Sequence, residues 1–383
     1  MRDNWTETTL GEIAEVIMGR QLSPSKKMGV RPKPYLRAAN IGNWGINLDD
    51  VLEMDFTESE ERQFASQIGD VLLVEGGNEK SVGCPALVSE LHEGLCIQNT
   101  IIRCRVKDLT QLSPNFLYHS LRHSFWLGKF GELCAGTTIM HLGQKRAIVF
   151  PFNVPPIAEQ KRIVDVVSSV DAYIDALQQQ VHTARTARNA VLHELLSAGG
   201  DNWTETTLGE IASWSSGKNL SSDKRKEAGQ IPILGANGII GRTDEVLLDE
   251  ELITVGRVGA CGETHRSSGP VWISDNALIV LPTDRVTIDF LYYVLSTFNY
   301  KSIISGTTQP LITQSKMKSQ VVNLPPIAEQ HRIVDVVSSM DDVIQATESA
   351  VVEAKNLRSG LLSDLLSGEH EIPVSYDELL GAA

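Results

Sequence analysis

Two stretches of the chain carry apolar residues at spacings that alternate between four and three positions. The first runs from residue 163 to 195 and the second from 333 to 365. A sustained period of about 3.5 residues is typical of coiled coils, so each stretch predicts a long helix with one apolar seam. The seam positions are Ile163, Val167, Val170, Ile174, Leu177, Val181, Ile333, Val337, Met340, Ile344 and Val351. Polar residues interrupt the pattern at Arg188, Thr347 and Arg358.

Residues that begin or stop helices flank both stretches: Pro155-Pro156, Gly199-Gly200, Pro325-Pro326 and Gly368. A helix of about 37 residues would be about 55 Å long at a rise of 1.5 Å per residue. The first helix leads away from one region and the second starts in the next, so a pairing of the two has to be antiparallel. The alternative is a helix in each half that packs only against its own domain.

The regions between these helices have the pattern of a mixed fold. Short apolar runs predict strands at residues 70–74, 100–102, 252–255 and 277–280. Glycine clusters predict turns at residues 76–77, 235–238 and 256–262. Residues 116–121 and 290–295 are expected to form short helices. The expected fold class is therefore α+β, with α-helical spacers.

Two segments are repeated almost without change. DNWTETTLGEIA occurs at residues 3–14 and again at 201–212, and PPIAEQ-x-RIVDVVSS occurs at 155–169 and 325–339. Identical runs of this length indicate a tandem duplication. The sequence between these markers differs between the two copies. Constant flanking segments around divergent inserts suggest two related domains, each of which recognises a different target.

The composition is that of an ordinary globular protein, with 42% apolar and 21% charged residues. No apolar run is long enough to span a membrane, and the first residues lack the pattern of a signal peptide. The five cysteines are odd in number and form no Cys-x-x-Cys pair. We therefore expect free thiols in the cytoplasm, without a zinc site or a redox pair.

The net charge of −14 argues against nucleic acid as a partner of the whole surface, but the charge is unevenly distributed. Residues 16–48 hold six basic residues and no acidic one, and residues 49–61 hold seven acidic residues and no basic one. Basic and polar residues near turn signals are candidates for contacts with phosphates and base edges. These candidates are Arg20, Lys26, Lys27, Arg31, Lys33, Arg37, Asn78, Lys80, Thr137, Thr138, Gln144, Lys145, Lys218, Lys224, Arg225, Lys226, Asn237, Arg242, Arg257, His265, Arg266, Thr307, Thr308 and Gln309. The alternative for any charge run is a solvated surface.

No motif in the chain predicts catalysis. The segment 153–156 resembles a methyltransferase loop only superficially, because it has an extra residue and occurs twice at a helix start. The glycine-rich segment 256–262 lacks the Lys-Ser/Thr of a phosphate-binding loop. Glu353 and Lys355 have a nuclease-like spacing but lie within the second heptad helix. We expect no catalytic residue, no metal site and no cofactor in this chain.

The two PPIAEQ segments, each of which closes a variable region and opens a long helix, carry a family resemblance. So do residues 234–241 and the Gly-Thr-Thr stretches at 136–138 and 306–308. The chain resembles the specificity (S) subunit of Type I restriction-modification systems. This resemblance covers nearly the whole chain. It implies two target recognition domains, joined by two long antiparallel coiled-coil helices and related by a pseudo-twofold internal duplication.

The resemblance also implies a division of labour. Each target recognition domain would read one half of a bipartite, asymmetric DNA site, and the helices would set the spacing and dock two methylation subunits. Restriction subunits would join the full complex, and S-adenosylmethionine, ATP and Mg would belong to these partners. The expected boundaries are 1–153 and 201–323 for the domains, 154–200 and 324–368 for the helices, and 369–383 for an acidic tail. A fused methyltransferase or nuclease, or a two-headed protein-binding scaffold, are the alternatives.

Overall fold

The chain forms two compact units in a computed structural model that describes residues 4–22, 29–42, 45–134, 140–305 and 310–381. Unit 1 comprises Met1–Ala176 with Val351–Ala383, and unit 2 comprises Leu177–Ala350. Both boundaries fall inside the long helices, so each unit contains a part of each helix. This division differs from the expected one, in which each helix is a separate spacer.

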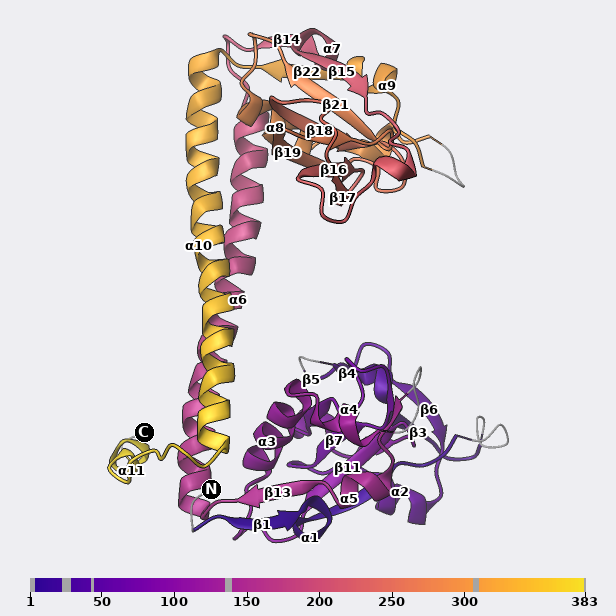
Figure 1. Ribbon diagram of the computed structural model, residues 1–383, viewed down its shortest axis with the longest axis vertical. Coiled ribbons are helices and arrows are strands. Elements are labelled where there is room, and N and C mark those ends of the chain that lie inside the picture. Colours follow the sequence, from indigo (N-terminus) through magenta and orange to yellow (C-terminus); the bar gives the residue numbers. More distant parts are fainter. Residues whose placement is uncertain (1–3, 23–28, 43–44, 135–139, 306–309, 382–383) are drawn as a thin grey trace. The chain divides into compact units, whose positions relative to one another are not determined.

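Three of the sheets of unit 1 form its framework (Figure 1). The four-stranded sheet has the order β2 (Ala14–Met18), β11 (Ile101–Val106), β7 (Val71–Val74) and β9 (Pro85–Leu87). The three-stranded sheet has the order β10 (Cys96–Ile97), β3 (Pro32–Leu36) and β6 (Leu52–Asp55). An antiparallel pair joins β1 (Thr6–Thr9) to β13 (Pro151–Val154) and so brings the two ends of the domain together.

Unit 2 repeats these three sheets strand for strand. Its four-stranded sheet has the order β15 (Ala212–Ser216), β21 (Ala277–Pro282), β18 (Glu251–Gly256) and β19 (Thr264–Ser268). Its three-stranded sheet has the order β17 (Gly238–Thr243), β16 (Ile231–Gly235) and β20 (Trp272–Ile273), and β14 (Thr204–Thr207) pairs with β22 (Val321–Leu324). The internal duplication therefore extends through the divergent inserts.

Short elements complete both units. Unit 1 contains α1 (Leu10–Ile13), α2 (Glu58–Phe64), α3 (Pro114–Trp126), α4 (Lys129–Leu133), α5 (Gln144–Ile148) and the two-residue strands β4 (Ile41–Gly42), β5 (Gly45–Ile46), β8 (Gly76–Gly77) and β12 (Met140–His141). Unit 2 contains α7 (Leu208–Ile211), α8 (Ile288–Ser296) and α9 (Gln314–Lys318). Single 3-10 turns are η2 (Ala38–Asn40), η3 (Glu90–His92), η4 (Ser222–Lys224) and η5 (Tyr300–Ser302). The expected short helices at 116–121 and 290–295 correspond to parts of α3 and α8.

The central strand β7 shows why these strands read as continuous apolar runs. Val71 and Leu73 pack in the cluster that contains Phe116 of α3, whereas Leu72 and Val74 pack in a second cluster on the other face. A strand that is covered on both faces needs apolar residues at every position. All four residues of β7 are buried.

The two long helices are α6 (Ile157–Ser197) and α10 (Ile327–Leu366). In unit 1, Ile163 and Val167 share a cluster with Leu362 and Leu365, and in unit 2 Leu192 packs with Val337. The start of each helix meets the end of the other, so the segments are antiparallel within each unit, as predicted. The buried seam residues are Ile163, Val167, Ile174, Leu177, Ile333, Val337, Ile344 and Val351, and the half-buried ones are Val170, Val181 and Met340. The predicted fold class is thus confirmed.

The segment after α10, residues 367–381, is called the tail below. It contains the short helix α11 (Tyr376–Leu380) and belongs to unit 1. All five cysteines are free thiols. Within the described ranges, no helix combines the length and the apolar character that crossing a bilayer requires.

Candidate functional site

The glutamine that ends each PPIAEQ motif is buried, and its three hydrogen bonds form what we call the glutamine clamp. Gln160 Nε2 donates to the carbonyl oxygens of Gln111 and Pro155, at 2.7 and 2.8 Å, and its Oε1 accepts from the amide of Ser113 at 2.8 Å. Gln330 makes the same three bonds in unit 2, to the backbone of Arg285, Pro325 and Thr287. Both glutamines are 0% exposed. The clamp ties the start of each long helix to the loop that precedes α3 or α8, which accounts for the repetition of this glutamine.

The polar residues that interrupt the seam form one ion pair in each unit. In unit 1 the guanidinium of Arg358 pairs with both oxygens of Asp171, and its Nη2 lies 2.9 Å from Oδ2. In unit 2 Arg188 makes the corresponding bidentate pair with Asp341, at 2.8 and 3.1 Å. The two PPIAEQ motifs are 170 positions apart. The same offset separates the two aspartates, at residues 171 and 341, and the two arginines, at residues 188 and 358. Each pair thus joins α6 to α10. The arginine comes from α10 in unit 1 and from α6 in unit 2.

The residue that lies next to this ion pair differs between the units. In unit 2 the hydroxyl of Tyr293 donates to Asp341 at 2.9 Å, and burial together with this carboxylate raises the pKa of Tyr293 to about 12. The corresponding residue of α3 is His119, which is 5% exposed and whose Nδ1 has no partner among the described residues. Burial lowers the pKa of His119 to about 4, so the imidazole is neutral at pH 7.

The basic run of unit 1 is paired with the acidic run that follows it. Arg31 bonds Glu58 and Glu61 at 2.7 and 3.0 Å, and Lys33 lies 2.6 Å from Glu61. Arg37 pairs with Asp50. These contacts form because β3 pairs with β6, and α2 follows β6 directly. The expectation of an open basic face is therefore not met by these three residues, whose charges are compensated within the domain.

Arg20 lies deeper than the rest of this run. It is 6% exposed, its Nε donates to Glu60 at 2.9 Å, and its Nη1 donates to the carbonyl oxygen of Asp55 at 2.5 Å. Its guanidinium also lies 4.9 Å from the centre of the Phe56 ring. These contacts use the guanidinium to hold β6 and α2 against the domain, so its surroundings are those of a structural residue.

Five of the basic candidates of unit 2 fall into two groups. In the first group the charge is compensated: Lys224 pairs with Glu245 at 3.1 Å, Lys226 with Asp244 at 2.7 Å, and Arg266 with Asp289 and Glu251. In the second group are Lys218 and Arg225, which are exposed and form no ion pair within the described residues. Lys80 and Lys145 of unit 1 belong to the same group.

Other candidates bond within their own domain. Gln144 Nε2 donates to the carbonyl oxygen of Val16 at 2.9 Å. In the amide orientation that satisfies its neighbours, Gln314, the equivalent residue of unit 2, donates to the carbonyl oxygen of Trp214 at 3.2 Å. Gln144 therefore belongs to the shared scaffold.

The remaining candidates differ in how far their polar groups are used. Arg242 Nη1 donates to the carbonyl oxygens of Gly229 and Gln230, and Arg257 Nη1 donates to Ser216. Arg257 Nε and His265 Nε2 have no partner among the described residues. Two polar candidates lie in exposed turns, Asn78 and Asn237. Lys26, Lys27, Thr137, Thr138, Thr307, Thr308 and Gln309 lie outside the described residues.

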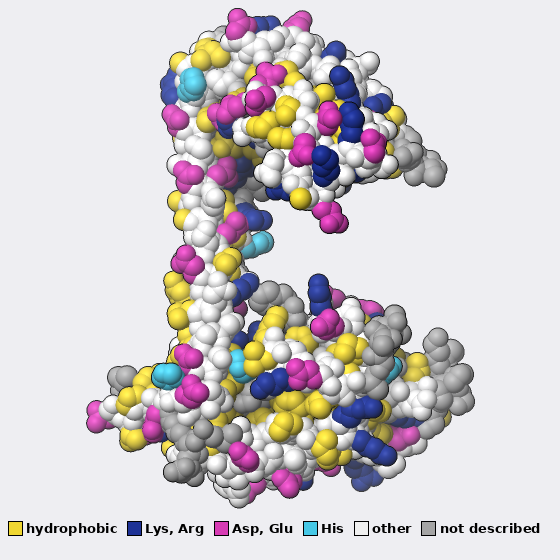
Figure 2. Space-filling view, in the orientation of Figure 1, with side chains coloured by type: hydrophobic (Ala, Val, Ile, Leu, Met, Phe, Trp, Pro, Cys, Tyr) yellow, Lys and Arg dark blue, Asp and Glu magenta, His cyan; other side chains and the backbone are white. Residues whose placement is uncertain are grey.

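Ala236 and Asn237 form the turn between β16 and β17, and Gly238 begins β17. Gly238 has a φ of +87°, a conformation that glycine adopts without strain, and Ile239 and Ile240 after it are exposed. This hairpin carries the segment on which part of the family resemblance rests. On the face shown in Figure 2, Lys and Arg side chains are interspersed with Asp and Glu over both units.

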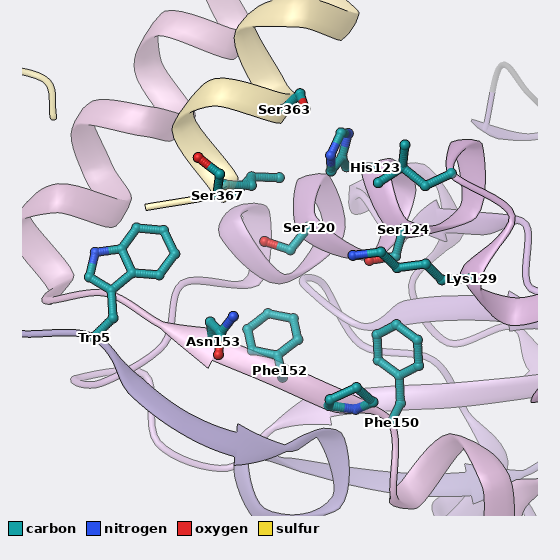
Figure 3. Close-up of a pocket in the computed structure, with 13 residues that line it drawn as sticks. Trp5, Ser120, His123, Ser124, Lys129, Phe150, Phe152, Asn153, Ser363 and Ser367 are labelled. Atoms are coloured by element: carbon teal, nitrogen blue, oxygen red, sulfur yellow. The ribbon is translucent and has the colours of Figure 1, made fainter. Parts of the chain in front are cut away.

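One cavity of unit 1 lies between α3, β13 and the segment in which α10 ends. It has a volume of about 220 Å³ and is lined by Ser120 and His123 of α3, Phe152 of β13, Ser363 of α10 and Ser367 of the tail (Figure 3). None of the described residues that line it is an acid or a cysteine. Across the described ranges, no group of three or more His, Cys, Asp or Glu side chains could hold a metal ion.

Sequence reasoning missed two glycines that the scaffold requires. A Cβ on Gly19 would lie 2.3 Å from the carbonyl oxygen of Gln98, and one on Gly217 would lie 2.1 Å from that of Ser274. The two glycines are 198 residues apart, as are the DNWTETTLGEIA markers. Extending that alignment by five positions beyond the markers would have found them.

Comparisons with known proteins agree on one family. The model of the Type I restriction modification DNA specificity domain matches residues 2–183 and 200–354. The chain is 21% identical to the putative type I restriction enzyme MjaX specificity subunit of Methanocaldococcus jannaschii, over 96% of this chain and 94% of that protein. It is 22% identical to the StySPI specificity subunit of Salmonella potsdam, over 96% and 89%. It is also 30% identical to the EcoprrI specificity subunit of Escherichia coli, over 40% of each chain.

Solved structures share the fold. The S subunit of a Type I restriction-modification system from M. genitalium matches with a TM-score of 0.57 at 19% identity, over 96% of this chain and 97% of that one. A chain from a study of complex assembly and conformational transition of the type I R-M system matches with a TM-score of 0.61 at 17% identity, over 95% and 98%.

Proposed function

The chain belongs to the Type I restriction-modification DNA specificity family, and from that premise we propose that each of its two units reads one half of a bipartite, asymmetric DNA site. A specificity subunit is the non-catalytic member of its complex. Methylation and ATP-dependent cleavage, with S-adenosylmethionine, ATP and Mg, belong to the partner subunits in this proposal. A cytoplasmic location, where duplex DNA and these subunits meet, is part of it.

The observation that carries the proposal is the contrast between scaffold and inserts. Both units have the same strand orders, the same glutamine clamp and the same helix ion pair. The charged residues that the inserts place on each surface differ in identity and in pairing. Two readers of different sequences require this combination, because the scaffold sets the position and the side chains set the specificity.

The contacts that we propose are exposed polar side chains that form no ion pair among the described residues. In unit 2 these are Lys218, Arg225, Asn237 and Arg242, of which Asn237 and Arg242 belong to the β16–β17 hairpin. In unit 1 they are Asn78, Lys80 and Lys145. Arginine, lysine and asparagine donate to base edges and phosphates. Arg20 and Gln144 are not among them, because Arg20 is buried beside Glu60 and Gln144 is half-buried.

Exchanging one insert tests the division into half-sites. Residues 16–153 replaced by the insert of another family member should change one half of the methylated sequence and leave the other half unchanged. Exchanging residues 213–323 is the matched control and should change only the second half. Sequencing of methylated sites in cells that carry the whole system gives the answer. A change in both halves after one exchange would contradict independent reading.

The helices would act as the spacer between the half-sites, and a helix insertion tests this role. Four residues inserted after Gln179, which is exposed, lengthen α6 by about 6 Å. The unread gap between the half-sites should then grow by about two base pairs at 3.4 Å each. Unchanged half-sites with an unchanged gap would contradict the spacer role. A two-headed protein-binding scaffold, the alternative, would show no preference for specific over unrelated duplex DNA in competition binding.

A further inference from the structure

The same helical surface occurs twice and is covered in only one unit. The motif Arg-Ile-Val-Asp-Val begins at residue 162 in α6 and at residue 332 in α10. Arg162 is 5% exposed, whereas Arg332 is exposed. The aspartate and the second valine of the motif are half-buried in unit 1 and exposed in unit 2. Because the residues are identical, the difference comes from what lies on them.

The tail lies on the first copy. Arg162 Nη1 donates to both carboxylate oxygens of Asp377, at 3.1 and 2.9 Å. The hydroxyl of Tyr376 donates to Asp165 Oδ2 at 2.7 Å. Ile372 packs against the apolar cluster of unit 1. Figure 1 shows how the tail leaves the end of α10 and closes with α11, which carries the tyrosine and the aspartate.

The second copy has no such cover. Arg332 bonds only the carbonyl oxygen of Ala328, at 3.4 Å, and forms no ion pair within the described part of the chain. The carboxylate of Asp335 has no hydrogen bond to a described residue. Ile327 and Val336 are 40% and 46% exposed beside them. This surface of unit 2, residues 327–336, thus offers a cation, an acceptor and apolar side chains together.

We propose that the surface 327–336 of unit 2 docks a methylation subunit, and that the tail is an internal competitor that occupies the duplicate of this surface in unit 1. This inference rests on the proposed function. The tail shows the chemistry of the occupant: a carboxylate for the arginine, a hydroxyl for the aspartate, and an apolar side chain, Ile372, that packs against the apolar cluster beside them. One methylation subunit binds unit 2 directly. The second has to displace the tail before it binds unit 1.

The tail is held weakly enough to be displaced. A helix as short as the five residues of α11 is not stable by itself, so its contacts with α6 keep it in place. Asp377 is 44% exposed, and solvent weakens its attraction to Arg162. A partner that covers a larger area can therefore replace these contacts, and the tail sets a threshold for the second binding step.

Titration of the full chain with the methylation subunit tests the proposal. Native mass spectrometry and calorimetry give the two stepwise dissociation constants. In the unaltered chain the second constant should be about tenfold weaker than for two identical sites, which corresponds to about 1.4 kcal/mol. The double variant Tyr376→Phe/Asp377→Asn should bring the two constants close to the statistical ratio for identical sites. A chain that ends at Gly368 should do the same.

The matched control is Glu378→Gln. It removes the same charge from the next residue of α11, where the side chain is exposed, and should leave both constants unchanged. Arg332→Gln should weaken the first binding step and leave the tail in place. Circular dichroism melting of every variant checks that the units remain folded.

Three results would overturn the proposal: equal constants in the unaltered chain, inequality that persists in both tail variants, or a first step that Arg332→Gln does not weaken. Each of these leaves DNA reading and complex assembly intact. If no variant binds the methylation subunit at all, the proposed function itself fails, which separates the two claims.

Discussion

Arg20 and Lys218 occupy equivalent positions in the two units and have opposite surroundings. Each follows a glycine whose amide donates to a neighbouring strand, Gly19 to Ile101 at 2.9 Å and Gly217 to Ala277 at 3.1 Å. The arginine of unit 1 is buried against Glu60, whereas the lysine of unit 2 is exposed. The two units thus share their backbone bonds and differ in the charged groups on them. The duplication preserved the backbone hydrogen bonds that position this residue, whereas the side chain at the position changed.

The largest effect is expected from the clamp that both units share. Gln160→Leu removes three hydrogen bonds at a site without solvent and leaves the amide of Ser113 unpaired. It should lower the free energy of unfolding of unit 1 by about 4 kcal/mol. Gln330→Leu should do the same to unit 2. Denaturant melts with hydrogen exchange assign each loss to its unit. Equal losses in both units from either variant would show that the units do not unfold separately.

The helix ion pairs should respond next. Asp171→Ala leaves Arg358, whose side chain is 8% exposed, without its partner, at a cost of about 3 kcal/mol. Asp341→Ala should cost about 2 kcal/mol, because the side chain of Arg188 is 14% exposed and the desolvation of its charge is less complete. Adding Arg358→Met to Asp171→Ala should restore most of the loss. A double variant as unstable as the single one would contradict the buried unpaired charge as the cause.

His119 makes unit 1 the acid-sensitive unit. Its folded pKa of about 4 lies below the unfolded value of about 6.5, so the unfolded chain binds the proton more readily between these values. The stability of unit 1 should be complete above pH 6.5. It should fall by about 1.4 kcal/mol per pH unit below that value, down to about pH 4. His119→Phe should remove the part of this slope that His119 contributes, and urea melts at several pH values measure it. Unit 2, with Tyr293 at this position, is the internal control.

The smallest effect is expected on the affinity for DNA. Lys218→Ala should remove one phosphate contact and reduce the slope of log K against log salt by about 0.9, with little change in stability. Arg20→Ala should lower the stability of unit 1 and leave the salt slope unchanged, because the guanidinium of Arg20 bonds Glu60 and not DNA. Fluorescence anisotropy at several salt concentrations, with thermal melts of both variants, makes the comparison. A salt slope that falls in Arg20→Ala alone would reverse the assignment.

The parts of the fold that the sequence predicts are those with a repeating signal. The duplicated markers and the heptad seam led to the two long helices, their antiparallel pairing and the α+β class. Near the ends of the helices the structure buries Leu192 and Leu362, whereas a strict seven-residue repeat counted from Ile163 and Ile333 points to Val191 and Leu361. An α-helix has 3.6 residues per turn, so over several heptads its buried face drifts away from a strict 3.5 pattern.

The candidate site was harder to predict because charge along the chain does not reveal which strands pair. The basic run 16–48 and the acidic run 49–61 read as two surfaces, but β3 and β6 bring them together as partners. Likewise, Arg188 and Arg358 read as interruptions of an apolar seam, although each has a carboxylate opposite it. A linear pattern gives the residue type and the spacing, and only the fold gives the neighbour.

The crossed ion pairs also bear on how such a chain can arise. The helix of the first repeat carries both Asp171 and Arg188, and that of the second carries both Asp341 and Arg358. A single repeat already contains both an aspartate and an arginine. When two copies of the helix pair antiparallel, the aspartate of each copy lies opposite the arginine of the other. Fusing two copies of an ancestral gene therefore required no newly evolved complementarity. Both partners lie outside the inserts 16–153 and 213–323, so recombination can replace either insert and inherit the pairing intact.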